Sequence, residues 1–241
     1  MQNEPHLERV GVALGDISRK RMLCAMMSGR AHTGKELALC AGVSASTATA
    51  HLERLRAGGL ITSHKSGRTT YHQLAGPEVA AALEGLAALV PASFLVRLRS
   101  AQSHDPGCLA ARCCYDHIAG GLGVELCKAL VDQGAVVIDD GIVRAGASPL
   151  ILGMVAGVAP EPGAVIGRTC LDWSERRLHL SGDLGRAILR RWIAEGWLKR
   201  SVQGRALILS GAGRDMLTLL GLQDGSATDE AMMRKDGGKV G

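Results

Sequence analysis

The sequence lacks any apolar run long enough to cross a membrane, and it lacks the motifs of several large enzyme classes. It contains no phosphate loop of the Gly-Lys-Ser/Thr kind, no nucleophile turn of the Gly-x-Ser-x-Gly kind and no His-Glu-x-x-His pair. The glycine turn Ser210-Gly-Ala-Gly213 follows an expected strand, but it lacks the further glycine and the acidic partner of a dinucleotide site. We therefore expect a chain that is not an enzyme and has no membrane partner.

The cysteines do not form the pattern of a disulfide framework, because there are seven of them at irregular spacing. The N-terminus carries acidic and polar residues instead of the charged and apolar blocks of a secretion signal. These two observations predict a cytoplasmic protein whose thiols are mostly reduced.

Residues 33–74 have the pattern of a winged helix-turn-helix. The expected elements are a helix over 33–40, a turn over 41–43, a helix from 44 to about 56, and strands over 60–64 and 69–74. Ser44 fits the N-cap of the second helix, and Gly58-Gly59 ends it. A short helix, a glycine turn, a polar helix and a basic β-hairpin in this order are typical of a module that reads DNA.

The second helix of this module has one apolar and one polar face. Small hydroxyl side chains near its start let the backbone approach base edges, and cations at its end and on the hairpin suit phosphates. The residues expected to contact DNA are Ser44, Ser46, Thr47, Thr49, His51, Arg54, Arg56, Lys65 and Arg68. The alternative is an ordinary helical hairpin with a solvated face, but this does not explain the basic hairpin that follows directly.

Charge is distributed unevenly along the chain. Residues 1–75 hold 10 Lys and Arg against 5 Asp and Glu, whereas residues 76–241 hold 18 of each class. The net charge of +5 therefore lies on the segment expected to meet DNA. Residues 168–214 form a second basic segment with 10 cations and 4 anions, which we interpret as a solvated helix face, with a related DNA role as the alternative.

Two further helices are expected around the module. Residues 7–28 read as a helical run that Gly11 and Gly15 weaken, so it is expected in one or two pieces. Pro77 starts a helix over 78–90 that is almost wholly Ala, Leu and Val, and Phe94, Leu95 and Leu98 continue its apolar stripe. A helix this apolar must be covered, and a second copy of the chain is the expected partner, with a monomeric core as the alternative.

The remaining chain predicts an α+β domain. The expected elements are a helix over 109–133, a hairpin over 134–143, a helix over 183–195, a hairpin over 197–210 and a short helix over 213–220, with no assignment for 144–170. The segment 193–205 repeats the helix end, glycine, strand and Gly-Arg tip of 55–68, and 130–142 is a fainter copy. The fold class is therefore mainly α with short β-hairpins, divided into domains 1–103 and 104–222 and a disordered tail 223–241.

Several segments resemble the ArsR/SmtB family of bacterial transcriptional repressors. The longest runs from Val43 to Leu55 (Val-Ser-Ala-Ser-Thr-Ala-Thr-Ala-His-Leu-Glu-Arg-Leu). The others are the stretches 14–23, 36–38 and 58–61 and the Gly67-Arg68 tip. The resemblance covers about residues 8–100. It implies a homodimer on a palindromic operator that an inducer releases, with Ser46, Thr49 and His51 at base-facing positions. Ala45 stands where the family often has glutamine, which leaves the operator sequence open.

The chain departs from this family at its familiar metal sites. The first helix of the module has no Cys-Val-Cys pair, and the helix over 78–90 has no His or Asp. Cys24 and Cys40 are single and are expected in the core. The C-terminal half resembles an extended subgroup of the family, through the segments 114–117 and 170–179.

These two segments carry candidate ligands for a thiophilic metal or metalloid. Cys114 and His117 lie three residues apart, which would place them on one face of the expected helix, and Cys170, Asp172 and His179 form a second group. Together they suit Zn(II), Cd(II), Hg(II) or As(III), or a thiol pair for an oxidant. The alternative is a structural helix end and a capping loop with Asp116 and His117 in a hydrogen-bonded network.

The sequence thus predicts a DNA-binding regulator, a homodimeric repressor whose C-terminal half senses its inducer. Two alternatives remain at this point. The first is a regulator that responds to a small molecule without metal or thiol chemistry. The second is an architectural DNA binder with no inducer, which the large apolar C-terminal half argues against.

Overall fold

The computed structural model describes residues 7–91, 106–201 and 204–222. The chain divides into two compact units between Leu83 and Glu84. The domain boundary expected at 103/104 falls among residues that the structure does not describe. The fold class is confirmed: a winged helix-turn-helix comes first, and an α+β unit follows.

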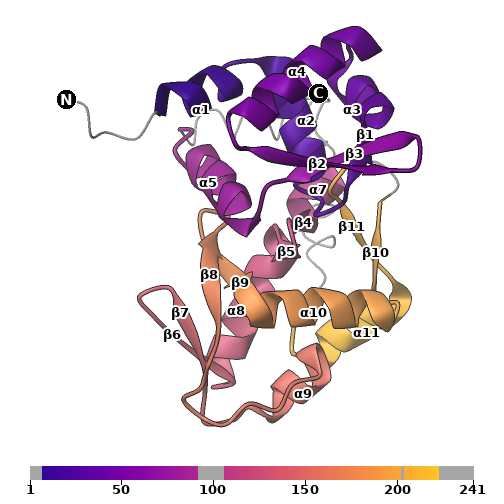
Figure 1. The fold of residues 1–241 in the computed structure, drawn as a ribbon. Helices are drawn as coiled ribbons and strands as arrows, with labels where there is room; N and C mark the ends of the chain where they lie inside the picture. Colours follow the sequence, from indigo (N-terminus) through magenta and orange to yellow (C-terminus); the bar gives the residue numbers. More distant parts are fainter. Residues whose placement is uncertain (1–6, 92–105, 202–203, 223–241) are drawn as a thin grey trace, which may run out of the picture. The chain divides into compact units, whose positions relative to one another are not determined.

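The first unit contains the winged helix-turn-helix (Figure 1). Its elements are α1 (Leu7–Leu14), α2 (Ile17–Met26), β1 (His32–Thr33), α3 (Gly34–Ala41), α4 (Ala45–Ala57), β2 (Ile61–Ser66), β3 (Thr69–Leu74) and the start of α5 (Pro77–Ala88). The strands form one antiparallel sheet in the order β1-β3-β2. The short strand β1 was not predicted, because two residues give no periodic pattern.

Side-chain caps define the two helices of the module. Ser44 accepts a hydrogen bond from the backbone N–H of Thr47 at the start of α4, as expected. Thr33 and Glu36 form a reciprocal capping box at the start of α3. Gly42 has a φ of 71°, so it ends α3 in the left-handed conformation that glycine adopts without strain.

The expected run over 7–28 is two helices. Asp16 separates them, because its carboxylate accepts from the backbone N–H of Arg19 and so caps α2. Arg19 is buried, and its guanidinium donates to the carbonyls of Ala13 and Val12, both at 2.7 Å. This side chain therefore ties the start of α2 back to the end of α1.

The expectation that Cys24 and Cys40 are core residues was wrong, since both are exposed. α2 buries its face through Met22, Leu23 and Met26. Cys24 is one residue beyond Leu23, and successive residues of an α-helix point about 100° apart. α3 likewise buries residues 37, 38 and 41, so Cys40 lies outside its buried face.

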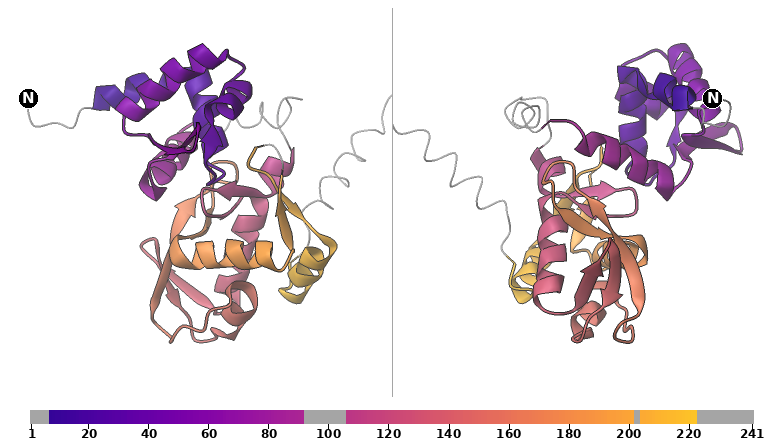
Figure 2. Two further views of the ribbon diagram at one scale, coloured as in Figure 1. Left: turned by 45° about the vertical axis from the view of Figure 1, so that its right-hand side comes forward. Right: turned by 90° about the vertical axis from the view of Figure 1, so that its left-hand side faces the viewer.

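The second unit is an α+β structure (Figure 2), and its described strands form three antiparallel sheets. Its elements after α5 are α7 (Pro106–Ala110), β4 (Arg112–Cys114), β5 (His117–Ala119), α8 (Gly121–Asp132), β6 (Val136–Asp139), β7 (Ile142–Ala145), α9 (Leu150–Ala156), β8 (Val165–Leu171), β9 (Leu178–Ser181), α10 (Gly182–Ala194), β10 (Leu198–Arg200), β11 (Leu207–Leu209) and α11 (Gly211–Leu219). The largest sheet has the order β6-β7-β8-β9, and β4-β5 and β10-β11 are two-stranded hairpins.

The helix expected over 109–133 was wrong in its first half. α7 ends at Ala110, the hairpin β4-β5 follows, and α8 begins only at Gly121. Tyr115 has a φ of 60° at the tip of this hairpin, and Gly120 has a φ of 78° just before α8. Because both conformations break an α-helix, the helical spacing of the apolar residues here does not reflect a helix.

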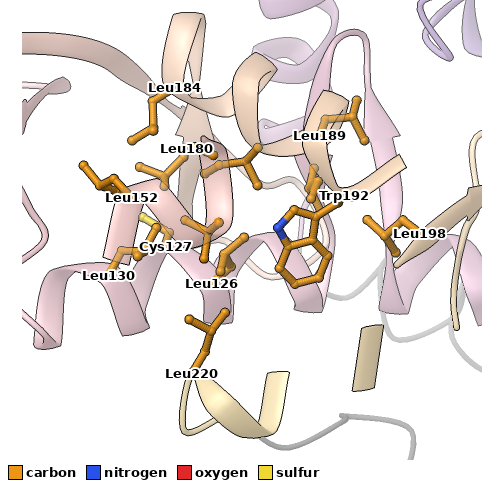
Figure 3. Packing of buried hydrophobic residues seen from close by; sticks show 14 of the residues in the cluster. Leu126, Cys127, Leu130, Leu152, Leu180, Leu184, Leu189, Trp192, Leu198 and Leu220 are labelled. Carbon is orange, nitrogen blue, oxygen red and sulfur yellow. The ribbon is translucent and has the colours of Figure 1, made fainter. Parts of the chain in front are cut away.

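The core of the second unit is built around α8 and α10. Trp192 is fully buried, with Leu126, Leu189 and Leu198 around it (Figure 3). Leu184 and Ile188 of α10 are also buried, so this helix, whose end begins the repeated segment 193–205, packs into the core. α9 lies within residues 144–170, for which no element was predicted, and β8 begins within this stretch and ends one residue beyond it.

Several expectations concern residues outside the described part of the chain. They are the apolar stripe through Phe94, Leu95 and Leu98 and the disordered tail 223–241. Across the described residues, no helix is both long enough and apolar enough to span a bilayer.

Candidate DNA-reading face and metal site

The start of α4 presents a cluster of exposed hydroxyl groups. The Ser44 Oγ lies 3.0 Å from the Ser46 Oγ and 2.9 Å from the Thr47 Oγ1. Thr49 is one turn further along and donates its hydroxyl to the carbonyl of Ala45 at 3.0 Å. Because these side chains are short, the backbone of α4 can come close to the base edges of DNA.

An open groove of about 680 Å³ lies beside this helix, between α3, α4 and the β2-β3 hairpin. Lys35, Arg56 and Arg68 line it with cations, and Glu53 is its one acidic lining residue. The hairpin tip is tight because Ser66 and Thr69 pair across it, and Gly67 turns there with a φ of 59°. Arg54 and Lys65 are exposed as well. The face is therefore polar and cationic, as a phosphate backbone requires.

His51 does not lie with these exposed side chains. Its Nδ1 atom is 3.2 Å from the Arg19 Nη1 and 3.9 Å from an Asp16 oxygen, and only 13% of its side chain is exposed. The structure thus places this ring against the start of α2, away from the base-facing role that the family resemblance implies.

The C-terminal candidates come together from two hairpins. Cys114 and His117 are directly opposite each other on β4 and β5, and Cys170 and His179 are directly opposite each other on β8 and β9. One ligand atom from each of the four residues lies within 4.8 Å of the others. Cys114, His117 and His179 are buried, and Cys170 is half-buried.

The two histidines face each other through the same ring nitrogen. The Nε2 atoms of His117 and His179 are 3.1 Å apart, and their ring centroids are 5.1 Å apart at an interplanar angle of 30°. The Nδ1 atom of His117 lies 3.1 Å from an Asp116 oxygen. Both imidazoles therefore direct Nε2 toward the centre of the cluster.

The two thiols of the cluster have opposite pKa shifts. A hydrogen bond from the Cys114 thiol lowers the pKa of Cys170, and His117 and His179 add to this effect while burial opposes it. The same hydrogen bond, together with burial, raises the pKa of Cys114. These opposite shifts favour ionisation of Cys170 over Cys114, and the thiolate is the form that metal ions bind.

Asp172, expected among the ligands, is a neighbour of the cluster instead. Its Oδ2 atom accepts from the Arg112 guanidinium at 2.8 Å and from the backbone N–H of Gly120 at 2.7 Å, and it is 3.8 Å from the Nδ1 of His179. Burial opposes its charge, but Arg112 and hydrogen bonds from Ser174, Gly120 and Glu175 hold the pKa of Asp172 well below its usual value.

Asp116 is a second carboxylate beside the cluster that the sequence did not single out as a ligand. Arg186 donates to its Oδ2 at 2.8 Å, while its Oδ1 faces the His117 ring. Burial opposes ionisation, but the hydrogen bonds from His117 and Arg186 outweigh it and lower the pKa of Asp116. This residue matches the hydrogen-bonded network with His117 that the sequence left as an alternative.

Glycines let the backbone pack tightly against both histidines. A Cβ atom at Gly185 would lie 2.6 Å from the Leu180 carbonyl oxygen and 3.0 Å from the His117 Cβ. A Cβ at Gly123 would lie 2.4 Å from the Ile118 carbonyl oxygen and 3.6 Å from the His179 Cβ. α10 and α8 thus fix the positions of the rings.

The donor set fits a soft divalent metal ion. Two sulfurs and two imidazole nitrogens are the donor types that could hold a zinc-type ion with four protein ligands. Cys113, although adjacent to Cys114, is not part of it, because neighbouring strand residues point to opposite faces and its thiol donates to the Tyr115 carbonyl at 3.1 Å.

Comparison with known proteins identifies relatives but no matching family profile. The chain is 33% identical over 214 residues to the uncharacterized HTH-type transcriptional regulator YdfF of Bacillus subtilis, covering 87% of this chain and 94% of that protein. It is 37% identical over 123 residues to the HTH-type transcriptional regulator CmtR of Mycobacterium tuberculosis, covering 51% of this chain and 92% of CmtR.

Among solved structures, the NMR structure of the cadmium metal-sensor CMTR from Mycobacterium tuberculosis superposes with a TM-score of 0.31 at 37% identity, over 35% of this chain and 86% of that chain. The match to YdfF covers nearly the whole of that regulator, and at 214 residues it extends into the second unit. The chain belongs to the HTH-type transcriptional regulators and is a DNA-binding regulator, not an enzyme.

Proposed function

We propose that the protein is a homodimeric repressor whose grip on its operator is released by a soft divalent metal ion of the Zn(II) or Cd(II) class. The ion is held by Cys114, His117, Cys170 and His179. The observation that carries the proposal is the convergence of these four donor atoms within 4.8 Å from two separate hairpins.

The DNA half of the proposal rests on the face around α4. Ser46 and Thr49 are exposed on the helix that enters the major groove, where they read base edges. Arg54, Arg56, Lys65 and Arg68 bind phosphates, because they are exposed cations beside that helix and on its hairpin. Ser44 contributes through the N-cap that fixes the start of the helix.

The dimer is supported by the apolar surface of α5. Leu86 on α5 is 48% exposed, and Leu89, in the turn directly after this helix, is 77% exposed. A second copy of the chain can cover such an apolar face without burying charged side chains.

The nature of the ion follows from the ligands. Thiolates select soft ions, and imidazole nitrogen suits zinc and its neighbours. Two imidazoles in place of further thiolates favour a divalent ion that accepts nitrogen over a metalloid such as As(III). The ion biases the DNA-binding equilibrium only if the operator-bound and released states differ in their affinity for it.

The first test is metal binding by the reduced full-length protein. Titration with Cd(II), followed by the ultraviolet charge-transfer band of the sulfur–cadmium bond, is expected to saturate at one ion per chain. Cys114→Ser and Cys170→Ser abolish the tight site, whereas Cys24→Ser and Cys40→Ser, which alter exposed cysteines of the first unit, leave it intact. A wild-type protein without the band would refute the metal half of the proposal.

The second test concerns base readout. Ser46→Ala with Thr49→Ala is expected to weaken binding to the protein's own upstream DNA about 10-fold or more, since each lost base contact costs about 1 to 3 kcal/mol. Binding to scrambled DNA, which depends on phosphates, changes little. Equal losses on both DNAs would remove these residues from sequence reading.

A further inference from the structure

The protons of the paired histidines are constrained by their surroundings. The Nδ1 of His117 lies 3.1 Å from the Asp116 carboxylate, so it carries a proton and donates. The two Nε2 atoms are 3.1 Å apart, which requires one proton between them. The hydrogen bond that joins the rings therefore occupies the two nitrogens that face the thiols.

The outer nitrogen of His179 has no hydrogen-bond partner among the described residues. The ring is fully buried, and this Nδ1 lies 3.8 Å from the Asp172 Oδ2, beyond hydrogen-bond distance but directed at a carboxylate. A buried ring nitrogen without a partner is costly, and a lone pair facing a carboxylate would be repelled. The site is therefore unsatisfied at one specific atom.

A metal ion between the two Nε2 atoms removes both difficulties. It takes the two Nε2 lone pairs, and the proton that lay between them moves to the Nδ1 atom of His179. Each ring then carries its single proton on Nδ1. His117 keeps its hydrogen bond to Asp116, and His179 presents an N–H to Asp172.

We propose that Asp116 and Asp172 are the outer-shell carboxylates of this metal site, which hold His117 and His179 as Nε2 ligands protonated on Nδ1. The inference rests on the metal site proposed above and adds two positioning residues to it. Metal-bound histidines commonly donate their second N–H to a carboxylate, which fixes the tautomer and strengthens the ligand.

Both carboxylates are held in place by partners other than the histidines. Arg186 donates to Asp116 at 2.8 Å. Asp172 accepts from Arg112 and Gly120 through one oxygen, and from the Ser174 hydroxyl at 2.6 Å through the other. Neither carboxylate is therefore free to turn inward and replace a sulfur or nitrogen ligand, which explains why Asp172 is a support and not a ligand.

The affinity test uses Asp116→Ala, with Asp183→Ala as its matched control. Asp183 pairs with the same Arg186 at 2.9 Å, but its side chain is 89% exposed and it has no contact with His117. Competition for Zn(II) against a chromophoric chelator is expected to show a 10- to 100-fold weaker site in Asp116→Ala. Asp183→Ala binds like the wild type, and Asp116→Asn, whose amide oxygen still accepts from Nδ1–H, recovers part of the loss.

Asp172 is tested in the intact protein, because removing it would also release Arg112 and Gly120. Long-range ¹H–¹⁵N spectra of the Zn(II)-loaded wild type are expected to show both rings metal-bound at Nε2 and protonated at Nδ1. Ligation of either ring through Nδ1, or equal affinities of Asp116→Ala and Asp183→Ala, would overturn the inference. A wild-type protein that binds no Zn(II) or Cd(II) at all would instead refute the proposed function.

Discussion

At the scale of single residues, the proposed metal site depends on positions that carry no candidate ligand. Gly185 and Gly123 bring α10 and α8 close to the rings of His117 and His179, with no room for a side chain. The ligands are therefore placed by backbone packing on both sides, and the site is sensitive to changes that leave every ligand intact.

Gly185→Ala is expected to destabilise the protein by about 1 to 3 kcal/mol, because its Cβ would lie 2.6 Å from a backbone oxygen. The control is Gly153→Ala in α9, where the nearest atom is 3.9 Å away and the gain in helix propensity is about 0.5 to 1 kcal/mol. Urea unfolding measures both variants. A Gly185→Ala protein as stable as the wild type would contradict the tight packing described here.

Two hairpin turns show which local structures a sequence pattern can predict and which it cannot. The turn between β6 and β7 is Asp140-Gly141, both with positive φ, and it follows a known two-residue pattern, so its hairpin was predicted. The turn between β4 and β5 is Tyr115-Asp116, with a φ of 60° at Tyr115. Tyrosine rarely adopts this conformation, and local patterns therefore favoured a continuous helix.

The cross-strand pairing of Cys114 with His117 follows from that turn, so the sequence brought these two residues together for the wrong geometric reason. It placed them on one helical face, whereas the structure places them opposite each other on adjacent strands. Asp172 was named as a ligand because its type and spacing fit one. Its hydrogen bond with Arg112, 60 residues away in sequence, is a tertiary contact that no local sequence pattern predicts.

At the scale of elements, the module around α4 was predicted well because its ends are marked by local chemistry. Ser44 caps α4 and Gly42 turns the chain before it. These capping signals lie within a few residues of the helix ends that they specify. The proposed metal site instead depends on contacts between residues far apart in the sequence.

Ser44→Ala is expected to lower stability by about 1 kcal/mol, because the backbone N–H of Thr47 loses its acceptor. Ser46→Ala, two residues on, is the control, since the Ser46 hydroxyl contacts the Ser44 side chain and not the backbone N–H of Thr47; a change within about 0.5 kcal/mol is expected. Thermal unfolding compares the two. Equal losses of stability in the two variants would show that the Ser44 hydroxyl does not act as a cap.

The hairpins β4-β5 and β8-β9 belong to different sheets, and the proposed metal ligands are divided between them. Metal binding is therefore expected to stabilise the second unit, by about 2.7 kcal/mol at a free ion concentration 100 times the Kd. Chelator treatment of the loaded protein should lower its Tm. The double variant Cys114→Ser, Cys170→Ser should show no metal-dependent shift, and a shift equal to that of the wild type would place the ion elsewhere.

At the scale of the whole molecule, charge separates the two halves. The net charge of +5 lies in residues 1–75, whereas the rest is neutral despite its many arginines. Much of the charge of the second unit is paired, as in Arg112 with Asp172 and Arg186 with Asp116. We therefore expect the salt dependence of DNA binding to arise in the first unit.

Lys65→Ala or Arg68→Ala is expected to reduce the slope of log K against log salt by about one for each phosphate contact removed. Arg190→Ala, in the exposed basic segment of the second unit, is the control and should leave the slope unchanged. Titrations at several salt concentrations measure both. A reduced slope for Arg190→Ala would show that the second basic segment also contacts DNA.

The most direct test of the account is fluorescence anisotropy of the reduced, full-length protein on DNA from upstream of its own gene, with and without Zn(II) or Cd(II). The account predicts tight, sequence-selective binding that the ion weakens at least 10-fold, and the same binding without any response to the ion in the Cys114→Ser and Cys170→Ser variants. Wild-type binding that is unchanged by an ion shown to occupy the site would contradict it.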